Sequence, residues 1–192
     1  MSRKFSLILV STVVGIGLAA TAAAVVLRGG SDSSTDDPRK LAEDTWKRLE
    51  SDDLDAAKSL FVLQEKPCGI DFGPECPAGK SSGSLVPALA VEGCAEVFMG
   101  ADQLDLVLNG VAPTGARLFG AYVSAGTVAS PDEVTLVAQQ PEGRIRRDIS
   151  MVLLNREGKI ARVNFPCKPM TAEAAMGAVD SSKVVIAGPA AD

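Results

Sequence analysis

The chain opens on an uninterrupted run of apolar residues. Residues 5–27, FSLILVSTVVGIGLAATAAAVVL, contain no charge. A helix of this length is about 34 Å long, enough to cross a hydrocarbon core of about 30 Å. Arg3 and Lys4 precede the run, and the acids of SDSSTDD follow it, so the excess of positive charge predicts a cytoplasmic N-terminus and an exported remainder.

A cleaved signal peptide is the alternative interpretation of this run. The basic start fits, and Ala20-Thr21-Ala22 or Ala22-Ala23-Ala24 could serve as the cleavage site. The apolar run is longer than the 7–15 residues typical of a signal peptide, so we favour an uncleaved single-pass signal anchor. Both interpretations place the rest of the chain outside the cytoplasm, either anchored in the membrane or secreted.

The pattern divides the whole chain into four segments, of which the first contains the apolar run. We expect a transmembrane signal anchor at 1–30, a polar tether at 31–37, a folded domain at 38–168 and an Ala-rich tail at 169–192. Most of the tail is expected to be mobile, although 172–179 could form a helical turn or two and 183–187 an edge strand.

The first part of the domain has helical periodicity. In residues 38–51, Leu41, Thr45, Trp46 and Leu49 form an apolar stripe, and Asp36 or Asp37 can cap the helix. The same spacing predicts a second helix at 53–62. Residues 93–99 are predicted as a third short helix, and the Gly-, Pro- and Ser-rich stretch between Glu65 and Pro87 as loop.

From about residue 104 the hydrophobic period changes to two. Strands are predicted at 104–111, 116–125, 133–140, 144–154 and 160–165, separated by Gly-, Pro- and Asn-containing turns. In the fourth strand, Ile149, Met151 and Leu153 share one face. One-sided alternation of this kind is typical of an antiparallel sheet with one covered face. The fold class predicted is therefore α+β, with two or three helices packed on an antiparallel sheet of four to five strands.

Charge limits the choice of partners. The whole chain carries a formal charge of −5 and residues 1–30 carry +3, so the exported part carries −8. Nucleic acid and anionic headgroups attract Lys and Arg, which makes a nucleic-acid role unsuitable. The membrane partner is expected to be reached through residues 5–27 instead.

The four cysteines, Cys68, Cys76, Cys94 and Cys167, all lie on the exported side, where an even number indicates two disulfides rather than free thiols. Their spacing and the absence of histidine do not suit zinc, and no metal or cofactor is expected. We favour Cys68–Cys76 and Cys94–Cys167, while pairing of Cys94 with Cys68 or Cys76 stays open.

Two stretches resemble nuclear-transport-factor-2-like domains. Residues 45–57, TWKRLESDDLDAA, resemble the opening pair of helices, and residues 146–163, RRDISMVLLNREGKIARV, resemble the closing hairpin, although Ile160 stands where an aromatic residue is usual. Residues 94–97 resemble the half-cystine that often opens the middle helix of these domains. The resemblance covers 38–167 and implies a curved sheet around a helix with a cone-shaped pocket. Such domains are common behind a single anchor in envelope proteins of high-GC Gram-positive bacteria.

The family resemblance implies no single activity, so candidate sites were chosen from residue chemistry. A ligand pocket could use Trp46, Phe119, Tyr122 and Met151, and a partner surface could use Arg144, Arg146 and Arg147. Each also has a purely structural interpretation: Trp46 as core, Tyr122 as a half-buried strand residue, and the arginines as a solvated face. Asp71 with Glu75, and Asp102 with Asp105, are acid pairs that could share a proton, but histidine is absent and no catalytic residue is assigned.

The sequence thus predicts a membrane-tethered, non-enzymatic envelope protein. We expect it to bind a partner protein or to serve as an accessory subunit of a membrane complex, because a tether raises the local concentration of the domain near membrane partners. A carrier or sensor of a small apolar ligand is the alternative function, and an enzyme is the third.

Overall fold

The computed structural model describes residues 37–72, 76–141 and 148–189. The apolar run 5–27 and the three arginines Arg144, Arg146 and Arg147 lie outside these ranges. Within them, no helix is long and apolar enough to cross a membrane.

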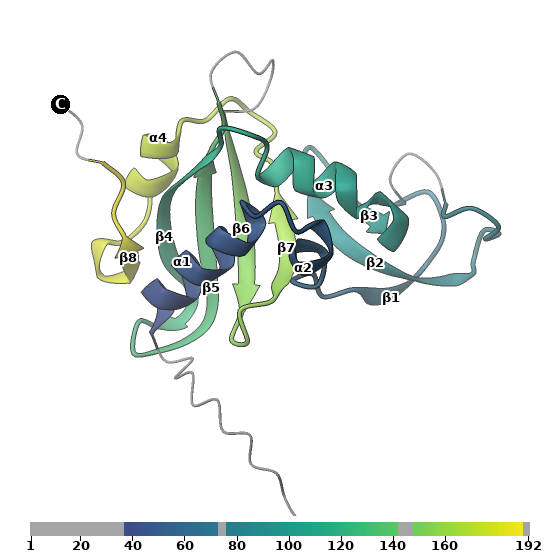
Figure 1. The fold of residues 1–192 in the computed structure, drawn as a ribbon, viewed down its shortest axis with the longest axis horizontal. Coiled ribbons are helices and arrows are strands. Elements are labelled where there is room, and N and C mark those ends of the chain that lie inside the picture. Colours follow the sequence, from purple (N-terminus) through teal and green to yellow (C-terminus); the bar gives the residue numbers. More distant parts are fainter. Residues whose placement is uncertain (1–36, 73–75, 142–147, 190–192) are drawn as a thin grey trace, which may run out of the picture. The chain divides into compact units, whose positions relative to one another are not determined.

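A mixed sheet of eight strands forms the centre of the described structure (Figure 1). Its order is β1-β2-β7-β6-β5-β4-β8, and β3 pairs separately with β2. All neighbours are antiparallel except β2 and β7, which run parallel. The strands are β1 (Gln64–Pro67), β2 (Leu85–Glu92), β3 (Glu96–Gly100), β4 (Arg117–Thr127), β5 (Ser130–Gln139), β6 (Ile149–Asn155), β7 (Ile160–Asn164) and β8 (Val184–Ile186).

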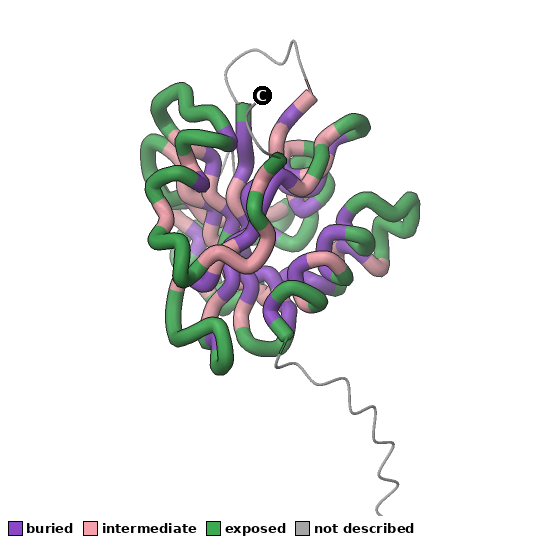
Figure 2. Tube along the Cα trace, turned by 90° about the vertical axis from the view of Figure 1, so that its left-hand side faces the viewer, coloured by how far each residue is buried: buried purple, intermediate pink, exposed green. Residues whose placement is uncertain are grey.

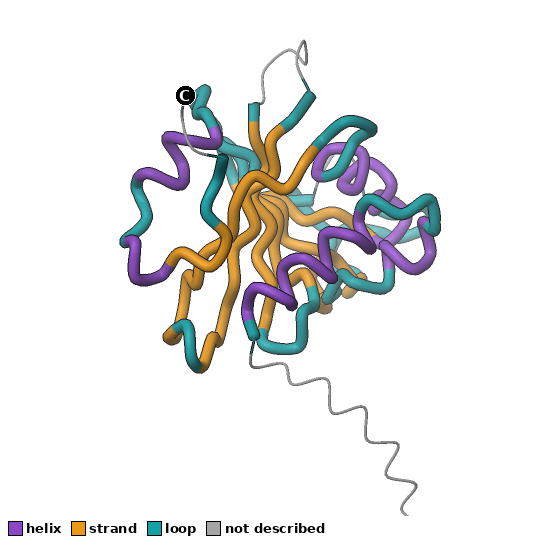
Figure 3. The backbone as a smooth tube through the Cα atoms, turned by 60° about the vertical axis from the view of Figure 1, so that its left-hand side comes forward, coloured by secondary structure: helices purple, strands orange, loops and turns teal. Residues whose placement is uncertain are grey.

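Four α-helices lie on the two faces of this sheet. Three of them, α1 (Pro38–Leu49), α2 (Leu54–Lys58) and α3 (Leu104–Val111), share one hydrophobic core with the sheet face that we call the inner face. The fourth, α4 (Ala172–Gly177), packs on the opposite, outer face. Figure 3 shows the strands between α4 and the other helices. The α+β class predicted from the sequence is therefore confirmed.

In β5 and β6, successive apolar side chains point alternately to the inner and the outer face of the sheet. Val134, Leu136 and Ala138 point to the inner core, and Val137 between them points to the outer face. In β6, Val152 and Leu154 face inward and Ile149 faces outward. These two central strands are covered on both sides. Figure 2 shows the buried segments in the interior, surrounded by exposed turns.

Helix α1 forms where its stripe predicts. Asp37 Oδ1 accepts hydrogen bonds from the backbone N–H of Arg39 (2.9 Å) and Lys40 (3.3 Å), and Pro38 occupies the first turn, where its missing N–H costs nothing. Trp46 and Leu49 are each 5% exposed in the inner core. The second predicted helix also exists, but α2 ends at Lys58 because the chain then turns so that Phe61 bridges to Ile160 of β7.

The predicted strand at 104–111 is wrong, because these residues form α3. Leu104, Val107, Leu108 and Val111 are buried at the i, i+3, i+4 and i+7 positions of a helix. A period of two would place Leu104, Leu106 and Leu108 on one face, but Leu106 points away from the core. Its side chain is 61% exposed.

The predicted helix at 93–99 is also wrong. The chain turns at residues 93–95 and returns as β3, antiparallel to β2. Val97 and Met99 pack on the inner core, and Phe98 between them packs on the opposite side with Phe72. Cys94 consequently lies in a hairpin turn rather than at the start of a helix.

The sheet is larger than the four to five strands predicted, and it is mixed rather than antiparallel, because β2 and β7 run parallel. The stretch between Glu65 and Pro87, predicted as loop, contains most of β1 and the start of β2. The predicted strands from residue 116 onward are confirmed as β4, β5, β6 and β7, with end shifts of a few residues, and β6 begins at Ile149 in the described part of the chain.

Part of the segment for which we expect mobility is packed against the sheet. Residues 172–177 form α4, and the suggested edge strand is present as β8, which pairs with β4 through Ala121–Ile186 and Tyr122–Val184. Ala172 and Met176 of α4 are buried in the outer cluster. Burial of these apolar side chains explains why the segment adopts defined structure.

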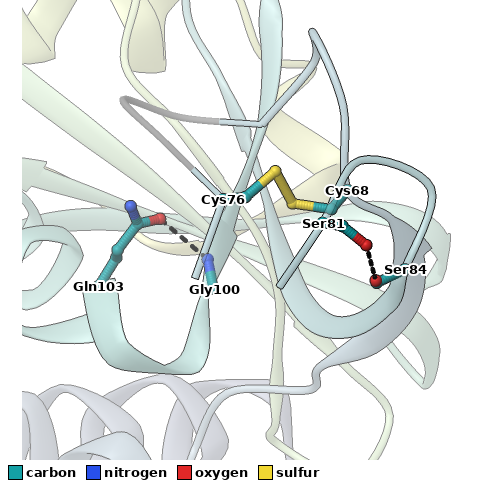
Figure 4. The surroundings of a disulfide bond; sticks show 6 residues. All are labelled: Cys68, Cys76, Ser81, Ser84, Gly100 and Gln103. Carbon is teal, nitrogen blue, oxygen red and sulfur yellow. Dashed lines mark hydrogen bonds between the residues drawn. A yellow bond between two sulfur atoms is a disulfide. The ribbon is translucent and has the colours of Figure 1, made fainter. Parts of the chain in front are cut away.

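Both favoured disulfides are confirmed. Cys68 pairs with Cys76 at a sequence separation of 8, and Cys94 pairs with Cys167 at a separation of 73. Figure 4 shows the first disulfide, next to the loop in which the hydroxyls of Ser81 and Ser84 lie 3.2 Å apart. On its other side, Gln103 Oε1 accepts a hydrogen bond from Gly100 N. Two disulfides are typical of an oxidising compartment outside the cytoplasm.

Candidate binding grooves

The four residues predicted to line one ligand pocket are divided between the two faces of the sheet. Trp46 lies in the inner core, where it is 5% exposed and packed as a structural residue. Phe119, Tyr122 and Met151 lie together on the outer face, in the cluster formed with α4. The single pocket predicted inside a cone is therefore not formed by this set, but three of its four members do meet.

A groove of about 550 Å³, which we call the α4 groove, opens beside these residues. Its floor is the outer face of β4 and β6, and its wall is α4 with the turn that follows. It is lined by Tyr122, Val123, Ser124, Met151, Met170, Ala174, Ala175, Ala178, Val179, Asp180 and Lys183.

Two irregularities in β4 shape the floor of the α4 groove. At two places β4 contains one residue more than the facing part of β5, which makes a β-bulge. The extra residues are Phe119 and Ser124. Such β-bulges redirect side chains. As a result Phe119 is buried under α4, in the outer cluster, and Ser124 lines the groove.

The bulge brings Ser124 into a short chain of hydrogen bonds. Ser124 Oγ lies 2.6 Å from Glu133 Oε1, and Thr135 Oγ1 lies 3.0 Å from Ser124 Oγ. Thr135 is buried, and Ser124 and Glu133 are half-buried. We call the part of the groove next to Ser124 its polar end. A mainly apolar lining with a few polar groups is the usual composition of a small-molecule site.

The close approach of α4 to β4 depends on a glycine. A Cβ atom on Gly120 would lie 2.9 Å from Met176 Cε and 3.0 Å from the carbonyl oxygen of Ile186. A side chain here would displace the end of Met176 and crowd the Ile186 carbonyl, so glycine favours the close approach of α4 and the pairing of β8 with the strand. Thr171 caps α4 by accepting a hydrogen bond from Ala174 N (3.2 Å).

Asp180 also lines the α4 groove, and it caps the 3₁₀ turn Ser181–Lys183 that precedes β8. It accepts hydrogen bonds from the backbone N–H (2.9 Å) and the hydroxyl (2.8 Å) of Ser182. These bonds, and to a lesser degree the charge of Lys183, lower the pKa of the Asp180 carboxyl. Asp180 is therefore a carboxylate at neutral pH and stands beside a cation.

A second hollow, the disulfide groove, lies on the other side of the sheet, next to Cys94–Cys167. It has a volume of about 430 Å³ and a mainly apolar surface. It is lined by Val91, Glu92, Gly93, Cys94, Ala95, Val97, Met99, Leu106, Val107, Gly110 and Phe165. Leu106 stands at its edge with most of its side chain exposed.

The disulfide groove is held in shape by three separate devices. The Cys94–Cys167 bond joins the β2–β3 turn to the segment after β7. Phe165 N donates a hydrogen bond to the carbonyl oxygen of Glu92 (2.8 Å). The ring of Phe165 packs against α3 at Gly110, where a Cβ atom would lie 2.8 Å from the ring. A groove fixed in this way loses little entropy when it binds a partner.

The other candidate residues do not form a site. Asp105 Oδ1 pairs with Lys58 Nζ at 2.9 Å and links α3 to α2, while Asp102 is exposed in the 3₁₀ turn before α3. No group of three or more His, Cys, Asp or Glu side chains in the described ranges could hold a metal ion. The arginines of the predicted partner surface lie outside those ranges.

Sequence reasoning missed most of the residues that line the two grooves. Leu106 could have been found, because a helical interpretation of 104–111 leaves it outside the buried stripe. Ser124 and Glu133 had no sequence signal, since they meet only through the bulged register of β4 and β5.

A scan against models of known protein families gives no match, and a search of curated proteins also finds none.

Proposed function

We propose that this chain is a membrane-tethered extracytoplasmic protein whose domain binds a partner protein in the cell envelope. Two features support this location. Residues 5–27 are long enough and apolar enough for a signal anchor, and the two disulfides suit an oxidising compartment. In this proposal the N-terminus stays in the cytoplasm and residues 31–37 tether the domain to the outer surface.

We further propose that the domain is a cone-fold domain of the nuclear-transport-factor-2-like type. The order of elements supports it: two helices come first, and β4, β5, β6 and β7 close the fold as consecutive antiparallel neighbours with α1, α2 and α3 on one face. This proposal predicts structure only, because the fold is compatible with many functions.

The disulfide groove is the observation that carries the protein-binding proposal. Leu106 is 61% exposed beside half-buried Val97 and Met99, in a groove braced by a disulfide. Protein interfaces bury rigid apolar centres of this kind inside a polar rim, and a few such residues supply most of the affinity. The expected partner presents one or two apolar side chains that enter the groove next to Leu106.

Site-specific photo-crosslinking in the cells that make the protein tests this proposal. A photoreactive phenylalanine analogue at position 106 is expected to give one adduct of defined mass, and Val97→Asp in the same chain should abolish it. Leu85 is the matched control, since it is 63% exposed on β2 and lines neither groove. Equal adducts from positions 85 and 106, or none from 106, would contradict the proposal.

A small apolar ligand is the second candidate function, and one observation favours it. Tyr122 and Met151, which the sequence analysis selected for a ligand pocket, both line the α4 groove. Met151→Arg would place a charge in the floor of this groove and should remove a bound ligand. It should leave the adduct at position 106 unchanged, because Met151 lies on the opposite face of the sheet from the disulfide groove.

A further inference from the structure

We infer that the α4 groove selects amphipathic ligands whose polar end is a cationic hydrogen-bond donor, such as a primary alkylamine. This inference rests on the second candidate function, ligand binding in the α4 groove, and adds the chemistry of the ligand. It follows from the direction of the hydrogen bonds at the polar end of the groove.

The carboxylate of Glu133 fixes the direction of every hydrogen bond in the chain. An ionised carboxylate can only accept, so the hydroxyl proton of Ser124 must point to Glu133 Oε1 across 2.6 Å. Ser124 Oγ therefore has no proton left for its neighbour, and Thr135 must donate to Ser124 across 3.0 Å. Both hydroxyl protons are thereby committed to protein atoms.

What these groups still offer a ligand is acceptor capacity. Ser124 Oγ, which lines the groove, keeps one lone pair and has no proton to give, while Glu133 places its negative charge one hydrogen bond behind it. The hydroxyl of Tyr122, also in the groove, can donate or accept and so tolerates a donor. A ligand head group that only accepts hydrogen bonds, such as a carboxylate, would face lone pairs at this end. It would lose its hydrogen bonds to water without gaining new ones, which weakens its binding.

Charge points the same way. Glu133 is half-buried and forms no ion pair within the described ranges. Asp180 and Lys183, which both line the groove, carry opposite charges that offset each other. Glu133, one hydrogen bond behind Ser124, is therefore the uncompensated charge beside the groove, and it favours a cation. Charge-assisted hydrogen bonds to carboxylates are stronger than neutral ones.

The rest of the groove suits an alkyl chain. Met151 of β6 and Met170 before α4 lie along it, with Ala174, Ala175, Ala178 and Val179 on the helical side. Small alanine side chains leave room beside the helix, and the flexible thioethers of methionine adapt to chains of different shape. The ligand is thus expected to place its head near Ser124 and its chain between the sheet and α4.

The methyl groups of Met151 and Met170 also allow ligand binding to be followed by NMR. The full-length chain is placed in nanodiscs of zwitterionic lipid, with ¹³C-labelled methionine methyl groups, and titrated with hexylamine, hexan-1-ol and hexanoate. These probes share one chain, and the amine is protonated at pH 7. Hexylamine should shift the Met151 and Met170 methyl signals in a saturable way. Met99, in the disulfide groove, is the internal control and should not shift.

We expect hexylamine to bind about tenfold more tightly than hexan-1-ol, and hexanoate to bind more weakly than both. Glu133→Gln keeps the acceptor for Ser124 but removes the charge, so it should abolish the preference for the amine and leave hexan-1-ol binding unchanged. Glu157→Gln is the matched control, because Glu157 is exposed in the β6–β7 turn and lines neither groove. It should preserve the preference.

The outcomes separate this inference from the function on which it rests. Equal binding of amine and alcohol, or an amine preference that survives Glu133→Gln, would overturn the choice of head group while ligand binding stands. Preferred binding of hexanoate would do the same. The absence of any saturable shift at Met151 and Met170 would overturn both. A shift of Met99 equal to that of Met151 would show non-specific uptake by an acidic protein and would also overturn the inference.

Discussion

The two faces of the sheet are built differently, and the difference separates stability from binding. On the inner face, three helices cover the sheet, and large side chains such as Trp46, Leu60 and Leu136 are 5% exposed or less. On the outer face, the six-residue helix α4 is the helix that packs on the sheet, and Tyr122 and Met151 stay half-buried. A filled layer holds the fold, and a partly covered layer leaves room for a ligand.

The largest effect is expected on the inner face. Trp46→Ala should lower the free energy of unfolding by about 3–5 kcal/mol, because it removes a large side chain from a layer with little room to collapse. Urea unfolding followed by circular dichroism measures this loss. Trp46→Phe, which keeps most of the volume, is the control, and a loss below about 1 kcal/mol for the alanine variant would mean that the inner layer is not closely packed.

The two disulfides are expected to differ in how much they stabilise the protein. Replacing Cys94 and Cys167 together by alanine should cost about 4 kcal/mol, and replacing Cys68 and Cys76 about 2–3 kcal/mol, because the first pair closes a much longer loop. Denaturation midpoints of the two double variants measure the difference. The reverse order would show that the short pair stabilises the protein by something other than loop closure.

On the outer face we expect a smaller and more local effect. Met176→Ala should cost about 2 kcal/mol, since Met176 is 9% exposed and anchors α4 on β4 and β5. Amide hydrogen exchange should rise in α4 and β8 and stay unchanged in β5 and β6. Met170→Ala, at a more exposed position, is the control. Equal loss of protection in all four elements would make the two layers one cooperative unit.

The helix caps offer the finest comparison. Asp37→Ala removes the cap of α1 and Thr171→Ala that of α4, and each should cost about 1 kcal/mol. The loss at Asp37 should appear in global unfolding, because α1 belongs to the inner layer. The loss at Thr171 should appear only as faster exchange in α4. Identical global losses would remove the distinction between the layers.

The sequence predicts a helix or strand correctly where the spacing of apolar residues fits only one of the two. α1 and the strands β4 to β7 were predicted because their stripes fit a single period. In residues 104–111, the spacing of Leu104, Leu106 and Leu108 fits a strand, whereas the spacing of Leu104, Val107 and Leu108 fits a helix. Packing against β6, which a local pattern does not show, selects the helix. The parallel pairing of β2 with β7 could not be predicted, since its partners lie about seventy residues apart.

The binding grooves were only partly predictable for a related reason. Tyr122 and Met151 could be selected because alternation shows which residues share a face. Their separation from Trp46 could not, because no local pattern tells whether a helix covers the same face of the sheet. The hydrogen bond between Ser124 and Glu133 depends on a bulge, and bulges leave no clear mark in a single sequence.

The Cys94–Cys167 bond also has a consequence for biosynthesis. A chain that emerges N-terminus first presents Cys76 only 8 residues after Cys68, but Cys167 follows Cys94 by 73 residues. Throughout that interval the thiol of Cys94 is without its partner and can attack the bond already formed between its predecessors. An isomerase in the compartment that receives the chain would reverse this exchange and speed formation of the Cys94–Cys167 bond.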